Sequence, residues 1–298
     1  MIKSSIDLGT NTCLLLVGEW DAKSQQVTRV IHDQSTLVRL GQNVDKTKRL
    51  HPDAVDRTRT CLKVYASQLI ELGLKPSETI AVATATARDA DNGVEFFSEI
   101  EKDFGFRFQI LTGDEEARYM FLGGLLPDST PEESIVIDIG GGSTELRSFE
   151  SGVSLPMGSV RFTERFLKSD PVTDQEFWAC QDAIDEMLES VDTSSFTGKS
   201  LVGVAGSIVT LAQWQWDVPV FDSKKLDGSV LTRGDVHRLV EGLKWRAISE
   251  RKELMGMEAG RADVILAGAL ILWRAMELFD FSEIKISTRG LRFGILAK

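Results

Sequence analysis

The sequence is poor in the residues that build disulfide frameworks and zinc sites. Among 298 residues there are only three cysteines and three histidines. They are Cys13, Cys61, Cys180, His32, His51 and His237. The cysteines form no Cys-x-x-Cys pair and the histidines lie far apart, so neither a disulfide framework nor a zinc site is expected. A reducing cytoplasm is the compartment that this cysteine usage predicts.

Long apolar runs and an excess of positive charge are also missing. No window is apolar enough to span a membrane, and no basic start followed by an apolar run indicates a signal peptide. The net charge of −11 argues against broad binding to nucleic acid or to a membrane surface. An anionic substrate fits this charge if a cationic pocket and a metal ion neutralise it locally.

The sequence does contain a run of three glycines between two strand-like segments. Ser134–Ile139 is typical of a strand, residues 140–142 of a turn, and residues 143–149 of a second strand. Successive glycine N–H groups can form a concave nest for an anion. Asp138 and Glu145 flank the turn, where they could hold a divalent cation beside the anion. A tight hairpin without a ligand is the alternative that this stretch alone leaves open.

The same pattern occurs again near the N-terminus. Residues 6–12 read Ile-Asp-Leu-Gly-Thr-Asn-Thr, so an aspartate again precedes a glycine and small hydroxyl residues. The two copies begin 131 residues apart, about the length of one domain. This repeat predicts an α/β fold of two duplicated domains, residues 1–125 and 126–298, with a phosphate loop in each and the ligand in a cleft between them. The C-terminal helix is expected to pack back on the first domain.

Arg88 follows a buried strand predicted over residues 79–85. Open α/β sheets place ligand contacts directly after their strands, so Arg88 is a candidate phosphate ligand. The alternative is a solvated arginine beside Asp89, which is the commoner situation for a single arginine.

Three acidic residues, 114–116, follow the next predicted strand. Thr112 and Glu115 resemble a capping box, and acidic residues in a first helical turn favourably oppose the helix macrodipole. One of the three could instead point into the cleft as a general base. The spacing does not choose between these two interpretations.

A third junction of small residues ends a strand at residues 201–207 and leads into a helix. Such a glycine-containing turn can approach a phosphate closely, and close helix packing is the alternative. Farther on, residues 260–279 are apolar on nearly all sides, which predicts a buried helix. Trp214 and Trp216 are expected in the core.

Six segments of the chain, taken together, resemble one protein family. They are residues 6–12, 84–90, 113–118, 138–146, 203–207 and 289–292. Their order and spacing are similar to those of the exopolyphosphatase/guanosine pentaphosphate phosphohydrolase (Ppx/GppA) family, over essentially the whole chain. The second glycine hairpin is the most diagnostic segment. The chain resembles the short, two-domain form, so the metal-type phosphohydrolase domain of longer members is not expected.

The resemblance implies an actin-like, ribonuclease H-like fold. It implies removal of terminal orthophosphate from inorganic polyphosphate or guanosine pentaphosphate, with guanosine tetraphosphate as a related ligand. Arg88 would correspond to the family's phosphate-binding arginine and Glu116 to its catalytic glutamate, with Glu115 as the one-place alternative. Mg²⁺, or alternatively Mn²⁺, would be held by Asp138 and Glu145, with Asp7 assisting. The phosphate-binding residues are expected to be Thr10, Asn11, Thr12, Gly140, Gly141, Gly142, Ser143, Gly206 and Ser207.

The first loop departs from the family's pattern in two places. Thr10 and Thr12 stand where serines are frequent, and Cys13 and Leu14 replace a more usual aromatic-polar pair. The second departure is expected to alter the rim of the pocket.

Other functions are compatible with the same motifs. A sensor that binds polyphosphate or a guanosine alarmone with little turnover is the main alternative, and a phosphotransferase is a third, because the actin-like superfamily contains kinases. A homodimer is expected from the common pattern of soluble enzymes. Basic residues could form a track for a long polyanion, although a solvated face explains each of them as well. These residues are Lys46, Lys48, Arg49, Arg161, Arg165 and Lys168.

Overall fold

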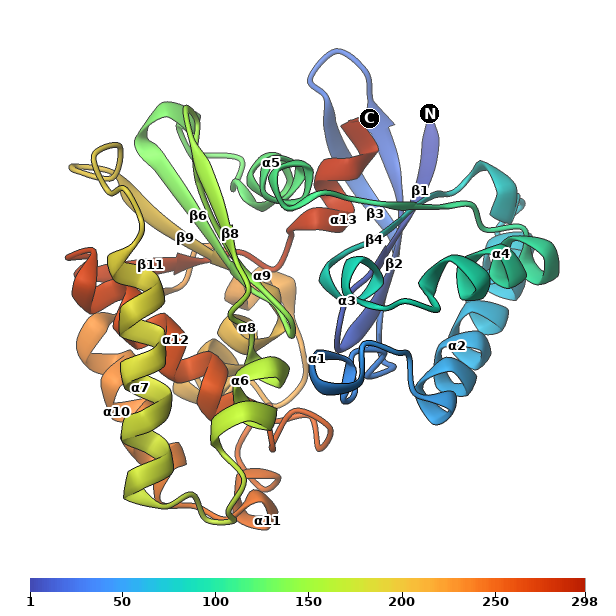
Figure 1. The fold of residues 1–298 in the computed structure, drawn as a ribbon. Coiled ribbons are helices and arrows are strands. Elements are labelled where there is room, and N and C mark those ends of the chain that lie inside the picture. Colours follow the sequence, from blue (N-terminus) through green and yellow to red (C-terminus); the bar gives the residue numbers. More distant parts are fainter. Residues whose placement is uncertain (298) are drawn as a thin grey trace. The chain divides into compact units, whose positions relative to one another are not determined.

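The structure is a computed structural model that describes residues 1–297 (Figure 1). Its internal contacts divide the chain into two compact units. Unit 1 consists of Met1–Gly123 together with the residues from Leu291 onward, and unit 2 consists of Gly124–Gly290. The C-terminal residues therefore return to the unit that the N-terminus begins.

Unit 1 is built on a five-stranded mixed sheet in the order β3-β2-β1-β4-β5. Its strands are β1 (Ile2–Leu8), β2 (Thr12–Asp21), β3 (Gln26–Leu37), β4 (Ile80–Ala83) and β5 (Phe108–Ile110). The first three strands form an antiparallel meander, and β4 and β5 run parallel to β1. The long strand β3 pairs with β2 along its length, with two register shifts.

Helices cover both faces of this sheet. The helical segments of unit 1 are α1 (Val44–Thr47), α2 (Pro52–Glu71), η1 (Pro76–Glu78), α3 (Ala85–Asp89), α4 (Gly93–Phe104), α5 (Gly113–Gly124), α13 (Leu291–Gly294) and η3 (Ile295–Ala297). Because side chains alternate along a strand, Leu15 and Leu16 of β2 face opposite sides. Leu15 belongs to the core formed with α2 and α4, whereas Leu16 packs with Phe293 and Leu296 of the C-terminal segment (Figure 1).

Unit 2 repeats the topology of unit 1. Its strands are β6 (Ser134–Ile139), β7 (Thr144–Ser148), β8 (Gly152–Leu155), β9 (Ser200–Val204), β10 (Val230–Thr232) and β11 (Glu283–Ile286). They lie in the order β10-β11-β9-β6-β7-β8. Read from β8, this order reproduces that of unit 1, with β10 added at the far edge. The predicted duplicated α/β fold is therefore confirmed.

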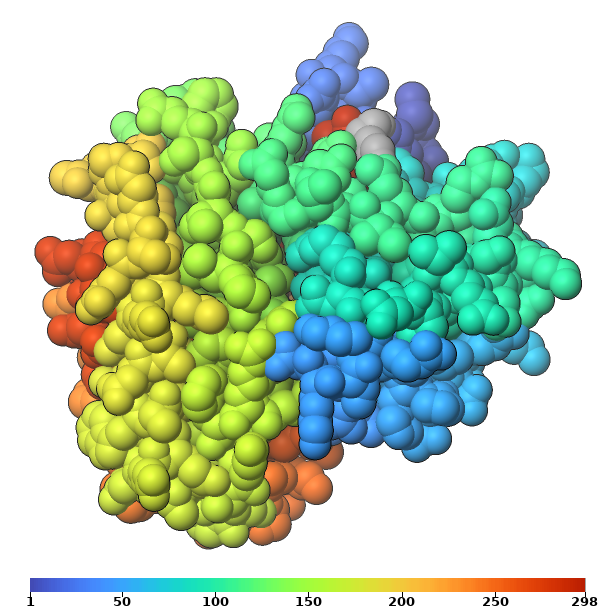
Figure 2. Space-filling model, in the orientation of Figure 1, coloured from blue at the N-terminus to red at the C-terminus, as the bar shows by residue number. Residues whose placement is uncertain are grey.

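The helices of unit 2 surround one largely buried helix. They are η2 (Pro131–Glu133), α6 (Ser159–Phe166), α7 (Asp174–Glu189), α8 (Ala205–Gln215), α9 (Ser223–Leu226), α10 (Arg233–Lys244), α11 (Ile248–Arg251) and α12 (Ile265–Leu278). The buried helix is α12, which packs against α6, α7, α8 and α10. Its position agrees with the apolar pattern of residues 260–279, although the helix begins only at Ile265. The yellow-green residues of α6 and α7 form an outer surface of unit 2 (Figure 2).

One core expectation is wrong. Trp216 follows the end of α8 and is 50% exposed, because the helix stops before it and leaves the indole outside the packed layer. No helix formed by residues 1–297 combines the length and the apolar character that a membrane span requires.

Candidate active site

The first glycine loop is a tight turn between β1 and β2. The Gly9 N–H donates to the Thr12 carbonyl at 2.9 Å and closes the turn. The carbonyl oxygens of Thr10 and Asn11 accept hydrogen bonds from the backbone of residues 38–41. Since carbonyl oxygens repel anions, engaging them in this way leaves the loop better suited to bind a phosphate through its N–H groups.

Side chains fix the same loop. The Thr86 hydroxyl of α3 donates to Thr10 Oγ1 at 2.8 Å, and both residues are buried. A Cβ on Gly41 would lie 2.2 Å from Thr10 Cγ2, so this position has room only for glycine unless Thr10 moves. Asn11 Oδ1 is buried and has no hydrogen-bond partner within residues 1–297, which is the situation of a polar atom reserved for a ligand.

Arg88 and Glu116 form an ion pair within unit 1. Arg88 Nη1 donates to Glu116 Oε2 at 2.7 Å and to the Leu111 carbonyl at 2.8 Å. Arg88 lies in the short helix α3 rather than in a loop, and its side chain is 26% exposed. It is therefore not the solvated arginine of the alternative interpretation, because its guanidinium is held over the start of α5.

Glu115 and Glu116 have different surroundings. Glu115 Oε2 accepts hydrogen bonds from the N–H and the hydroxyl of Thr112, and the Glu115 N–H donates to Thr112 Oγ1, which completes a capping box. Glu116 is buried instead. Burial raises the pKa of Glu116 above its ordinary value, and the positive charge of Arg88 opposes this rise.

Asp7 lies in the same unit on β1, the strand that pairs directly with β4. Burial raises the pKa of Asp7 to about 7, and the negative charge of Glu116 adds to this rise. Arg292 opposes it, but the guanidinium of Arg292 is already committed to a bidentate pair with Asp33, with two contacts of 2.8 Å. Unit 1 therefore gathers two carboxyl groups that bind protons more readily than usual.

The second glycine loop, between β6 and β7, repeats the first one. The Gly140 N–H donates to the Ser143 carbonyl at 3.0 Å, as Gly9 does to Thr12. Here the carbonyls of Gly140 and Gly141 accept from backbone N–H groups at the start of α6. Both loops therefore direct their carbonyls into the protein, although different segments hold them.

The start of α6 packs tightly against this second loop. A Cβ on Gly158 would lie 2.5 Å from the backbone carbonyl of Gly141, so only glycine fits without a backbone shift. Arg161 Nε donates to the Gly142 carbonyl at 2.8 Å. The guanidinium of Arg161 is thus placed at the loop, whereas Arg165 and Lys168 of the expected basic track are exposed.

Two carboxylates stand side by side next to the second loop. Asp138 of β6 and Glu145 of β7 are direct cross-strand partners, so their side chains lie on the same face of the sheet. Glu145 is buried, and its Oε1 accepts a hydrogen bond from the Ser154 hydroxyl at 2.7 Å. Carboxylate oxygens are the donors that Mg²⁺ prefers, and Mg²⁺ commonly takes one or two of them together with phosphate and water. The residues present therefore fit a divalent cation.

The described part of the chain forms no complete metal cage by itself. Within residues 1–297, no three histidine, cysteine, aspartate or glutamate side chains come together as a metal-holding group. Of the three expected ligands, the structure brings together Asp138 and Glu145, while Asp7 belongs to unit 1.

The junction between β9 and α8 is strained. Ala205 has a φ of 73°, in the left-handed region that L-residues avoid, at the first residue of α8. A Cβ on Gly206 would lie 2.0 Å from Arg261 Nη1, and Ser207 packs against Gly268 of α12. Ser207 therefore has the packing role that the sequence left as an alternative, and a phosphate role for Gly206 and Ser207 stays a prediction.

Several residues at these loops lie outside the sequence-based set. Thr86 and Gly41 fix the first loop, Ser154 holds Glu145, and Gly158 and Arg261 approach the backbone of the second unit. Of these residues, only Gly158 could have been suggested by the sequence, because it forms a glycine-serine pair after β8 like the pairs in other glycine turns. The others depend on contacts between distant segments, so no short motif indicates them.

Comparisons with known proteins identify the family of this chain. The chain matches the Ppx/GppA phosphatase family over residues 20–298. It is 34% identical to exopolyphosphatase 2 of Mycobacterium tuberculosis, over 90% of this chain and 88% of that protein. It is 30% identical to the bifunctional 3-dehydroquinate synthase/phosphatase of Fusobacterium nucleatum, over 99% of this chain, but the chain spans only 46% of that relative's length. The crystal structure of the Aquifex aeolicus Ppx/GppA family member superposes with a TM-score of 0.78 at 31% identity, covering 100% of this chain and 96% of that one. The chain therefore belongs to the Ppx/GppA phosphatase family.

Proposed function

We propose that this chain is an exopolyphosphatase, which hydrolyses the terminal phosphoanhydride bond of inorganic polyphosphate and releases orthophosphate. The observation that carries the proposal is the buried Glu116 paired with Arg88 at the start of α5. Family membership and the exopolyphosphatase of M. tuberculosis among its relatives support the substrate class.

Glu116 is proposed as the general base. A carboxylate whose pKa is raised accepts a proton from water more readily near neutral pH, and burial has this effect on Glu116. Glu115 is less suited to this role, because its carboxylate is engaged in the capping box with Thr112. In the proposed step, water attacks the terminal phosphorus in line, its proton passes to Glu116, and the shortened polyphosphate leaves.

Arg88 and the two loops are proposed to hold the phosphoryl groups. Phosphoryl transfer depends mainly on positioning and on neutralising charge, which backbone N–H groups and a guanidinium supply. Arg88 also keeps the Glu116 carboxylate in place through their 2.7 Å contact. The unpartnered Oδ1 of Asn11 supports the first loop as one proposed point of contact with the ligand.

Asp138 and Glu145 are proposed to hold Mg²⁺, with Mn²⁺ as a substitute and Asp7 as a further ligand. When bound, the ion would neutralise phosphate oxygens. Ser154 would fix the orientation of the Glu145 carboxylate through its 2.7 Å hydrogen bond. A cation of this kind also suits a chain whose net charge is −11 and whose substrate is a polyanion.

Guanosine pentaphosphate is the second proposed substrate, because it carries the same terminal phosphoanhydride bond. Both substrates should be tested together by measuring orthophosphate release with Mg²⁺ or with EDTA. Glu116→Gln is expected to lower the rate by about 10²–10⁴-fold, which is the usual contribution of a general base.

Glu115→Gln is the matched control. Since Glu115 caps α5, its loss is expected to cost about 0.5–2 kcal/mol of stability and to leave most of the activity. Full activity in folded Glu116→Gln would contradict the assignment of the base. Tight binding of either substrate without phosphate release would instead identify the wild-type chain as a sensor.

A further inference from the structure

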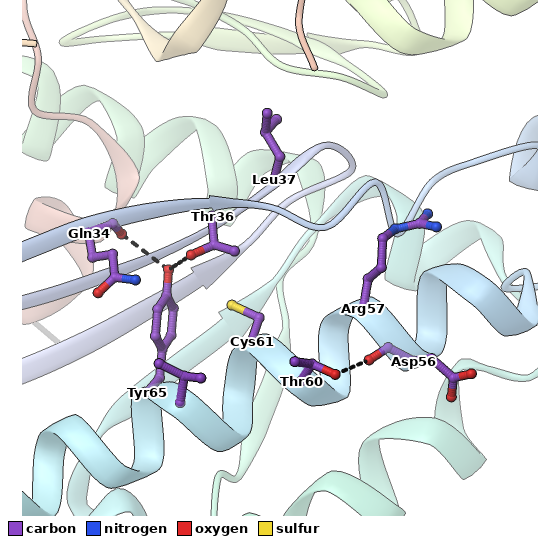
Figure 3. Close-up of a pocket in the computed structure, with 9 residues that line it drawn as sticks. Gln34, Thr36, Leu37, Asp56, Arg57, Thr60, Cys61 and Tyr65 are labelled. Atoms are coloured by element: carbon purple, nitrogen blue, oxygen red, sulfur yellow. Dashed lines mark hydrogen bonds between the residues drawn. The ribbon is translucent and has the colours of Figure 1, made fainter. Parts of the chain in front are cut away.

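Unit 1 contains an open pocket that none of the proposed site residues line. Its volume is about 430 Å³, and it lies between β3 and α2. Thr36 and Leu37 of β3 and Cys61 and Val64 of α2 are among the residues around it (Figure 3). Val64 is 44% exposed at this pocket, whereas Cys61 is only 5% exposed. The pocket is thus open to solvent and contains a cysteine thiol among its lining groups.

The Cys61 thiol has a second cysteine beside it. Cys13, the first residue after the loop Thr10–Asn11–Thr12, is fully buried on β2 and is a hydrogen-bond partner of the Cys61 thiol. Neither cysteine is in a disulfide in this structure. Two free thiols in contact, one of them lining a pocket, form an arrangement in which both sulfurs can react in sequence.

Polar groups around the pair favour the thiolate of Cys61. Its sulfur interacts with the hydroxyl groups of Thr36 and Tyr65 as well as with Cys13, and Figure 3 shows it turned from α2 toward β3. The hydrogen bond from Cys13 is the main reason why the pKa of Cys61 is lowered, and burial raises the pKa of Cys13. Tyr65 is itself fixed, with its hydroxyl 2.8 Å from the Cys13 carbonyl and 2.9 Å from Thr36 Oγ1.

The third cysteine provides an internal comparison. Cys180 is fully buried in the core of unit 2, and burial raises the pKa of its thiol to about 12. It is not among the residues that line the pocket of Cys61, and it has the surroundings of an inert core thiol. Of the three cysteines, Cys61 is thus the one whose surroundings favour reaction.

We propose that Cys61 is a site of thiol–disulfide exchange with small organic disulfides that enter this pocket, and that Cys13 is the resolving thiol. In the first step the Cys61 thiolate attacks one sulfur of the small disulfide, forms a mixed disulfide and releases one thiolate. Cys13 then loses its proton to solvent and attacks the Cys61 sulfur. This forms the Cys13–Cys61 bond and releases the second thiolate, so the protein is oxidised by two electrons and the small disulfide is reduced to two thiols.

The bond would connect the beginning of β2 to α2. Thr12 directly precedes Cys13, so the link would restrain the first glycine loop. The proposal does not depend on which substrate the chain hydrolyses, because its test counts thiols and measures mass rather than phosphate release.

The test uses the full chain, reduced and freed of reductant, incubated with excess 2-hydroxyethyl disulfide. Intact mass spectrometry and peptide mapping then identify the products. The wild type is expected to lose two of its three free thiols, with no retained adduct, and to yield a linked peptide pair containing Cys13 and Cys61. Cys180 is expected to stay free.

Variants separate the two roles. Cys13→Ser is expected to retain one hydroxyethylthio group on Cys61, and Cys61→Ser is expected not to react. Cys180→Ser should behave as the wild type does, and circular dichroism should show that each variant is folded. A wild type that keeps three free thiols, or that reacts at Cys180 as fast as at Cys61, would overturn the proposal. A stable adduct on wild-type Cys61 would overturn the assignment of Cys13.

Discussion

Each sheet contains a row of four residues that are paired across neighbouring strands, and the two rows have the same residue types at three of the four positions. In unit 1 the row across β4, β1, β2 and β3 reads Val82, Asp7, Leu14 and Ser35. In unit 2 the row across β9, β6, β7 and β8 reads Val204, Asp138, Glu145 and Ser154. The duplication therefore preserves a valine, an aspartate and a serine, and replaces an apolar side chain by a second carboxylate. This single difference gives unit 2 the pair of carboxylates that we propose to hold a divalent cation.

The largest expected effect comes from removing that second carboxylate. Glu145→Gln should weaken Mg²⁺ binding by about 100-fold or more, because loss of a ligand should exceed the 10–100-fold effect of an outer-shell partner. Titration of phosphate release with Mg²⁺ measures this change. Leu14→Gln, at the matching position of unit 1, is the control and should leave Mg²⁺ affinity within about threefold of the wild type. Equal losses in both variants would mean that the carboxylate pair is not the metal site.

Asp7, the aspartate of the unit 1 row, should make the free energy of unfolding depend on pH. Its pKa is about 7 in the folded chain, so between about pH 4 and pH 7 the folded state binds more protons than the unfolded state. Stability should therefore fall as pH rises through this window, by roughly 2 kcal/mol for Asp7 after allowance for its partial exposure. Denaturant unfolding in EDTA should show a smaller decline in Asp7→Asn. An unchanged decline would assign it to other groups, such as Glu116.

The two glycines that pack against the loops, Gly41 and Gly158, should differ in how much stability is lost when a methyl group is added. In Gly158→Ala the new Cβ would meet the backbone of Gly141 at 2.5 Å, so the backbone must shift, at a cost of about 1–3 kcal/mol. In Gly41→Ala it would meet the side chains of Thr10 and Thr86, which can rotate. Chemical denaturation should show the larger loss of stability for Gly158→Ala. The opposite order would mean that the first loop is the more rigid one.

The serine of the row should affect Mg²⁺ affinity in unit 2, where it is Ser154, but not in unit 1, where it is Ser35. Ser154→Ala removes the hydrogen bond to Glu145 and is expected to weaken Mg²⁺ binding about tenfold. Ser154→Thr keeps the hydroxyl and should restore most of the affinity. Ser35→Ala, at the same register position in unit 1, should have no measurable effect on Mg²⁺ affinity, since its neighbour is Leu14. Similar losses in both alanine variants would argue for general destabilisation.

The smallest expected effect concerns backbone strain that unit 2 alone shows at its strand-to-helix junction. Ala205, the first residue of α8, has a positive φ, whereas Ala85, the first residue of α3, does not. Ala205→Gly should relieve this strain and stabilise the chain by up to about 1 kcal/mol. Ala85→Gly should be destabilising instead, because it only adds freedom to the unfolded chain. Thermal unfolding would distinguish the two, and a loss of stability in Ala205→Gly would show that the strain has been overestimated.

Much of the fold can be predicted from the sequence because its signals are local. The aspartate-glycine pattern identifies both hairpins, and the boundaries of β6 agree with those that the apolar run predicts. The end of β9 is placed less well, since the small residues Ala205, Gly206 and Ser207 suit a strand end and a helix start equally. Trp216 is wrongly predicted in the core because an indole has no local feature that tells where a helix stops.

The site is harder to predict, because its key distinctions are contacts between distant segments. The sequence indicates a capping box with Glu115 but leaves Glu115 and Glu116 as alternative bases, whereas in the structure Thr112 engages Glu115 and Arg88 engages Glu116. The sequence also does not indicate that Leu14 takes the place of a second carboxylate, because only the strand register makes it the counterpart of Glu145.

The return of the chain's last residues to unit 1 has a consequence for biosynthesis. Lys3 Nζ and Ser5 Oγ donate to the carbonyls of Leu296 and Arg292, and Phe293 and Leu296 cover the apolar face that includes Leu16. During translation, the first sheet leaves the ribosome long before these residues are made. At about 5–20 residues per second, synthesis of the intervening unit 2 takes roughly 8–33 s. Throughout that interval one face of the first sheet lacks its native cover. During that interval the nascent protein is therefore exposed to aggregation and to chaperone binding through its first domain.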